Sequence, residues 1–104
     1  DNLDIHDKEL DYVKRGSTEL RAIIGLANDK KTAKKMEFLY DLIYSSPVKS
    51  HPSVKVYERN VLALIEQLRI DIANGDDTNI HSIMDKIKEN AELRNRKLQM
   101  QSST

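Results

Sequence analysis

Apolar residues recur along most of the chain at intervals of three and four positions, the period that places them on one side of an α-helix. The first row comprises Leu10, Val13, Ser17, Leu20, Ile24 and Ala27, and the second comprises Ala33, Met36, Leu39, Tyr40 and Ile43. The third row comprises Val54, Tyr57, Val61, Leu64, Ile65, Leu68 and Ile72. The fourth comprises Ile80, Ile83, Met84, Ile87, Ala91 and Leu98. The pattern predicts four amphipathic helices.

Helix-breaking and capping residues separate these rows. Gly16 and Ser17 interrupt the first row and are expected either to kink that helix or to split it, with Ser17 and Thr18 as a second N-cap. The first helix is expected to end at Asn28 and Asp29.

Proline and glycine mark the later boundaries. The second helix must stop before Pro47, because the residue before a proline avoids the helical conformation. Ser50 or Ser53 is expected to cap the third helix, which ends at Asn74-Gly75. The acidic segment 76–78 is expected to cap the fourth helix.

Short connections between four such helices favour an all-α fold, an antiparallel up-down four-helix bundle. We expect one domain over residues 1–104, with frayed ends at 1–6 and about 98–104. Because polar residues dominate after Ala91, Asn90 to Thr104 is predicted to be a solvated tail. The longest apolar run, Val61–Ile65, is far too short to span a bilayer, and the chain has no cysteine, so we expect a cytoplasmic protein.

The 104 residues balance 17 basic against 17 acidic side chains, but unevenly along the chain. Residues 30–60 carry three acids and seven bases. Four of these bases are the lysines that open the second helix: Lys30, Lys31, Lys34 and Lys35. Cations there oppose the helix dipole. Either nearby acids, expected to be Asp71, Asp76 and Asp77, compensate them in a solvated rim, or they bind an acidic protein, an anionic lipid surface or a phosphate backbone.

A second basic group, Arg94, Arg96 and Lys97, is a further candidate for partner binding. The dipole favours cations at the end of the last helix, so these three are expected to need no partner within the chain. Nucleic acid is disfavoured as a partner because the net charge is zero and no aromatic residues lie among the bases.

Catalytic motifs are absent from the sequence, including phosphate-binding glycine loops and the zinc-binding His-Glu-x-x-His. His81 and Asp85 are four residues apart, as two metal ligands on one helix could be, but a capping histidine is the simpler interpretation. His6 and His51 are expected to be solvated. Asp76 and Asp77 resemble a carboxylate pair, yet helix capping explains both. We therefore expect a non-catalytic protein without metal or cofactor.

The aromatic residues flank the proline-containing loop. Phe38 and Tyr40 cannot both lie on the apolar side of the second helix, so one packs against another helix or stays exposed, and core packing is the expectation. The third helix is the most apolar, which favours a central position in the bundle. A homodimer through that helix is the alternative.

Three segments together resemble the immunity proteins of pediocin-like (class II) bacteriocins. They are Phe38-Leu39-Tyr40-Asp41-Leu42-Ile43, the loop with Pro47-Val48-Lys49 and Pro52, and the helix closing at Asn74-Gly75-Asp76-Asp77 before the Ile80–Ile87 helix. The resemblance implies a cytosolic four-helix bundle that protects a bacteriocin producer by acting with the membrane sugar transporter that the bacteriocin attacks.

In that family the C-terminal region is tied to recognition of the cognate bacteriocin and is often aromatic. The corresponding segment here, Asn90 to Thr104, contains no aromatic residue but includes Arg94, Arg96 and Lys97. A second hypothesis is a small helical adaptor or dimerising regulator that binds a protein or nucleic acid through the lysines at 30–35.

Overall fold

The computed structural model describes residues 2–102, and the side chains of residues 12–100. Four helices account for most of the chain: α1 (Asn2–Ile24), α2 (Lys30–Tyr44), α3 (Lys55–Ala73) and α4 (Ile80–Ser102), with a short 3₁₀ helix, η1 (Pro52–Val54), before α3. No strand occurs within this part of the chain, so the all-α prediction with four helices is confirmed. None of its helices is both long enough and apolar enough to cross a membrane.

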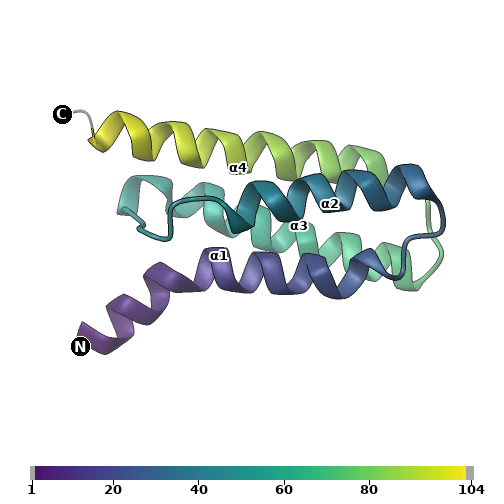
Figure 1. Cartoon of the computed structure of the whole chain (residues 1–104), viewed down its shortest axis with the longest axis horizontal. Helices are drawn as coiled ribbons and strands as arrows, with labels where there is room; N and C mark the ends of the chain where they lie inside the picture. Colours follow the sequence, from purple (N-terminus) through teal and green to yellow (C-terminus); the bar gives the residue numbers. More distant parts are fainter. Residues whose placement is uncertain (1, 103–104) are drawn as a thin grey trace.

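The helices lie roughly side by side in an elongated molecule (Figure 1). The α1–α2 and α3–α4 connections lie at one end, and the loop before η1 lies at the other end, near the C-terminal turns of α4. Helix α1 packs against α2 and α3, and α4 packs against α3 and α2.

All four helices contribute to one apolar core. Its members come from the rows that the sequence predicts, and they include Val13, Leu20, Met36, Leu39, Ile43, Val61, Ile65, Leu68, Ile80, Ile83, Met84, Ile87 and Ala91, together with Tyr12 and Ile23. Because nearly all of this core is aliphatic, the burial of small and medium side chains along each row is the main source of stability.

Helix α1 is continuous through Gly16, so of the two alternatives left open at Gly16 and Ser17, the split with a second N-cap is wrong. The Ser17 hydroxyl donates to the Val13 carbonyl oxygen at 2.7 Å, inside the helix, rather than capping a new one. Gly16 serves close packing, because a Cβ atom there would lie 3.3 Å from Cγ2 of Ile43 and 3.7 Å from Cδ1 of Ile65. The glycine therefore lets α1 approach α2 and α3 closely.

Helix α3 ends as predicted, at Asn74-Gly75. Gly75 has φ of 69°. The N–H groups of Gly75 and Asp76 donate to the carbonyl oxygens of Ile72 at 3.1 Å and Asp71 at 2.8 Å. This is a Schellman cap, which needs a left-handed residue.

The predicted N-caps are wrong for α3 and α4. The side chain of His51, not of a serine, caps η1 by accepting from the Ser53 N–H at 3.1 Å. The Asp76 carboxylate accepts from the Thr78 N–H at 3.1 Å within the turn, and α4 begins later, at Ile80. Short polar side chains also close local turns, so their presence alone does not fix the first residue of a helix.

The solvated tail predicted from Asn90 is also wrong, because α4 continues to Ser102 and buries Ala91, Arg94 and Leu98. Fraying at residues 1–6 and about 98–104 stays a prediction, and residues 1, 103 and 104 lie outside the described part of the chain.

Core packing of the aromatic residues is wrong for Phe38, which is 51% exposed with the Lys88 ammonium 5.8 Å from its ring centre. Tyr40 and Tyr44 stack on each other along α2, with ring centres 5.5 Å apart. Two aromatic faces of α2 are thus accessible, one on the α4 side and one on the α1 side.

Candidate functional site

The lysines that open α2 lie at the end of the molecule that carries the α1–α2 connection (Figure 1). Lys30, Lys31 and Lys34 are exposed. Lys35 is partly buried, and its Nζ lies 3.2 Å from Nδ1 of His81 and 3.7 Å from Oδ1 of Asp85. The prediction of a partly paired rim therefore holds for Lys35.

The compensating acids differ from those predicted. Asp29 caps α2 by accepting from the Thr32 N–H at 2.7 Å, and this backbone hydrogen bond lowers the pKa of Asp29. Asp71 instead accepts from Nε2 of Gln67 at 2.8 Å. No ion pair joins Asp71, Asp76 or Asp77 to these lysines in the side chains the structure describes, although Asp77 lines a small cavity with Asp29 and Thr32.

His81 and Asp85, the two residues with the spacing of metal ligands on one helix, both lie beside the Lys35 ammonium. Within residues 12–100 no group of three or more His, Cys, Asp and Glu side chains is arranged to hold a metal ion.

The C-terminal basic group divides into two kinds of residue. Arg96 and Lys97 are exposed on α4, as a partner-binding role requires. Arg94 is fully buried, so its placement as a surface cation without an internal partner is wrong. Its Nε donates to Oε2 of Glu58 at 3.0 Å, an ion pair between α4 and α3 in which both side chains are almost completely buried.

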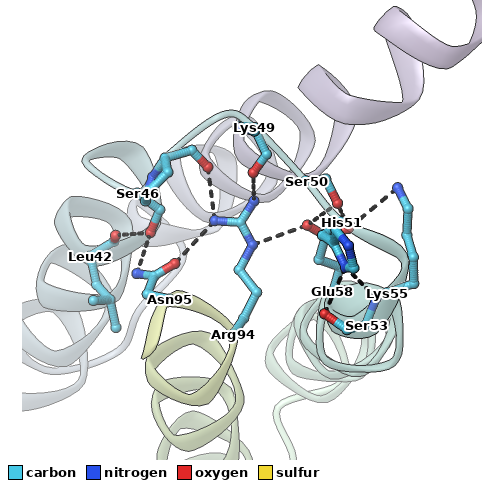
Figure 2. Close-up of polar contacts among 11 residues, drawn as sticks. Leu42, Ser46, Lys49, Ser50, His51, Ser53, Lys55, Glu58, Arg94 and Asn95 are labelled. Atoms are coloured by element: carbon cyan, nitrogen blue, oxygen red, sulfur yellow. Dashed lines mark hydrogen bonds and ion pairs between the residues drawn. The ribbon is translucent and has the colours of Figure 1, made fainter. Parts of the chain in front are cut away.

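Arg94 also fixes the loop between α2 and η1, as Figure 2 shows. Its two terminal nitrogens donate to the carbonyl oxygens of Pro47 at 2.8 Å and Lys49 at 3.0 Å. One of them also donates to Oδ1 of Asn95 at 3.0 Å. Four hydrogen bonds use most of the five N–H groups of the guanidinium, which explains how a full charge is accommodated in the interior.

Neighbouring polar side chains complete this network. The Asn95 amide donates to Oγ of Ser46 at 2.8 Å, and that hydroxyl donates to the Leu42 carbonyl oxygen at 2.6 Å. On the other side, the Ser50 hydroxyl lies 2.9 Å from Oε2 of Glu58, and the Lys55 ammonium lies 3.6 Å from Oε1. We call Ser46, Ser50, Glu58, Arg94 and Asn95 the Arg94 network; it joins α2, the loop, α3 and α4 (Figure 2).

Tyr12 closes the network from α1. Its ring centre lies 4.4 Å from the guanidinium carbon of Arg94, a cation–π contact in a desolvated setting. The Tyr12 hydroxyl is buried and has no hydrogen-bond partner among the residues that the structure describes. Burial raises the pKa of the Tyr12 phenol to about 12, and the nearby Arg94 cation offsets this only in part.

A surface groove of about 630 Å³ adjoins the Arg94 network at the same end of the molecule. It is lined by Pro47, Lys49, Ser50, His51, Asn95, Leu98 and Gln99. Exposed Lys49 and His51 bring a cation and an imidazole to it, and Pro47 and Leu98 bring apolar surface. Among the residues that the structure describes, no carboxylate lines the groove, so its chemistry suits an extended polypeptide segment with acidic or carbonyl groups.

Sequence reasoning missed Glu58 and the role of Arg94, yet a signal was present. Glu58 lies four residues after Val54 and three before Val61, on the apolar row of α3. Arg94 lies three after Ala91 and four before Leu98, on the row of α4. A charged residue inside a helical apolar row is rarely buried unless it is paired, so two such residues on neighbouring helices predict an ion pair.

No family model, no curated protein and no solved structure matches this chain.

Proposed function

We propose that the protein is a non-catalytic immunity protein that protects a bacteriocin-producing bacterium, acting in the cytoplasm as an antiparallel up-down four-helix bundle. Its partner in this proposal is the complex of a membrane transporter with the bacteriocin, which it contacts at the inner face of the membrane. The resemblance in residues 38–52 and 74–87 is the starting point.

One structural observation supports the proposal. The loop that carries Pro47 and Pro52 and the C-terminal part of α4, which the resemblance links to recognition, together form the groove beside the Arg94 network. Arg94 holds both walls of this groove, because it belongs to α4 and binds two loop carbonyls. A preorganised groove loses less conformational entropy when a polypeptide binds, which suits a protein that works by contact alone.

The test is expression of the chain in a sensitive strain that is then challenged with a panel of class II bacteriocins. We expect at least one bacteriocin to lose potency. Lys49→Glu reverses an exposed charge in the groove and should remove this protection. Arg59→Glu makes the same charge change at an exposed position outside the groove and should retain it.

Unchanged killing by every bacteriocin of the panel, with the protein present at a normal level, would contradict the immunity function. Protection that survives Lys49→Glu would instead place the contact elsewhere, and Arg96 and Lys97 would be the next positions to reverse.

A further inference from the structure

Helix α1 has opposite charges in its two halves. Residues 1–11 contain five acidic residues and one lysine, whereas residues 12–24 contain three basic residues and Glu19. Because α1 is unbroken from Asn2 to Ile24, residues at alternating intervals of three and four fall in one row along it. That row consists of Asp4, Asp7, Asp11, Lys14, Thr18 and Arg21. The sequence of this row is therefore acidic over its first three positions and basic at Lys14 and Arg21.

The basic half of this row borders a groove of about 620 Å³ between α1 and α2. The groove is lined by Val13, Lys14, Ser17, Thr18, Arg21, Tyr40, Tyr44 and Val48. Lys14, Thr18 and Arg21 are exposed, and Tyr44 is 65% exposed. Among the side chains that the structure describes, neither Lys14 nor Arg21 forms an ion pair, and no carboxylate lines the groove.

We propose that the occupant of this groove is a second copy of the chain, whose residues 2–11 lie antiparallel to residues 14–21 of the first. In this register Asp4 is opposite Arg21, Asp7 is opposite Thr18 and Asp11 is opposite Lys14. A two-fold axis near residue 12 repeats each pair, so the same surface of both copies forms the interface. The proposal does not rest on the immunity function.

The dimensions agree with this arrangement. At 1.5 Å per residue, the ten-residue helical segment 2–11 is roughly 15 Å long. The α1 wall of the groove extends from Val13 to Arg21, a length of roughly 12 Å, so the two lengths are similar. A concave surface with accessible Tyr40 and Tyr44 suits a helix laid into it, with the aromatic rings as anchors. A flat lipid surface would contact only the rim of such a groove.

Charge reversal in both halves of α1 provides a sharp test. Lys14→Glu/Arg21→Glu gives an acidic row throughout, and Asp4→Lys/Asp7→Lys/Asp11→Lys gives a basic row throughout. Each variant alone should raise the dimer dissociation constant at least about tenfold, because like charges then face each other. Mixed in equal amounts, the two variants should form a heterodimer, because the two charged pairs, 4 with 21 and 11 with 14, are again opposite in charge.

Sedimentation velocity over a range of protein concentrations measures both effects, with far-UV circular dichroism to verify folding. Arg59→Glu/Lys86→Glu is the matched control, since it reverses two exposed cations on α3 and α4. It should dimerise as the unaltered chain does. A fluorescent peptide of residues 1–12 gives a readout that does not depend on folding of the triple variant. It should bind the unaltered protein and not Lys14→Glu/Arg21→Glu.

Three results would overturn the proposal. The first is an unaltered chain that stays monomeric up to about 1 mM, a concentration at which even weak specific association is detected. The second is a dimer that survives Lys14→Glu/Arg21→Glu. The third is a monomer that binds phosphatidylglycerol-containing vesicles through Lys14 and Arg21, which would make the groove a lipid contact.

Discussion

Replacing Arg94 with methionine removes the guanidinium but keeps a long apolar side chain in the same space. The Glu58 carboxylate, 6% exposed, would then keep only the Ser50 hydroxyl and the partly exposed Lys55 ammonium at 3.6 Å. The carbonyl oxygens of Pro47 and Lys49 would lose their donor as well. The substitution therefore leaves one buried charge and two loop carbonyls without their principal partner.

Removing one member of a buried ion pair costs about 3–5 kcal/mol, and the two carbonyls place the expected loss at the upper part of that range. A small domain has only about 5–15 kcal/mol of net stability. Arg94→Met should therefore lower Tm by more than about 10 °C. Arg94→Lys should also be destabilising, because a single ammonium cannot reach Glu58 and both carbonyls together.

The matched variants are Glu58→Leu and the double variant Arg94→Met/Glu58→Leu. Apolar replacement of both partners removes the uncompensated charge, so the double variant should be more stable than Arg94→Met alone by at least about 1 kcal/mol. Urea unfolding followed by far-UV circular dichroism measures all four proteins. A loss below about 1 kcal/mol for Arg94→Met, or a double variant no more stable than Arg94→Met, would refute the account of the network.

Three further predictions concern single features. Tyr12→Phe should stabilise the protein by about 1 kcal/mol, because it removes a buried hydroxyl that has no hydrogen-bond partner among the described residues. The raised Tyr12 pKa of about 12 also makes the protein lose stability as the pH rises from about 10, where the phenol of the unfolded chain ionises, to about 12. Tyr12→Phe should reduce this loss, and urea midpoints measured across that pH range would show it. Gly75→Ala should cost about 1 kcal/mol in thermal unfolding, since its φ of 69° is unfavourable for a residue with a Cβ atom; an unchanged Tm would mean that the turn relaxes. Lys30→Gln/Lys31→Gln should raise stability by about 0.5–1.5 kcal/mol by removing cations from the first turn of α2, whereas Lys34→Gln, beyond that turn, should change it little; equal effects in urea titrations at low salt would argue against a dipole origin.

The helical part of the fold was predictable because the apolar rows are long and regular. The row of α4 is buried as expected, the row of α3 is buried except for the partly buried Tyr57, Leu64 and Ile72, and Pro47 and Gly75 mark where α2 and α3 end. The ends that rest on side-chain capping were less predictable. Serine and aspartate form other local contacts as readily as they cap helices. Ser50 therefore donates to the Glu58 carboxylate, and the Asp76 carboxylate accepts from the Thr78 N–H in the turn before α4.

The candidate site was predictable only in part, because it depends on which polar residues face each other in three dimensions. The basic character of residues 94–97 suggested a solvated helix end, yet Arg94 lies on the buried side of α4 while Arg96 and Lys97 do not. Similarly, the sequence pointed to acids after α3 as partners of the lysines, whereas Lys35 pairs with Asp85 one turn into α4. Distances between elements decide such pairings, and helical periodicity does not supply them.

The bonds from Arg94 to Pro47 and Lys49 have a consequence for the order in which the native molecule opens. Loops usually exchange their amide protons independently of the helices beside them, but here the loop is held by a side chain in the interior of α4. The loop and the last turns of α4 should therefore open together, as one cooperative unit with a single free energy. Hydrogen exchange at Ser50 and Leu98 would then slow or quicken in parallel, and a chain shortened just before Arg94 would lose protection in the loop about 45 residues away.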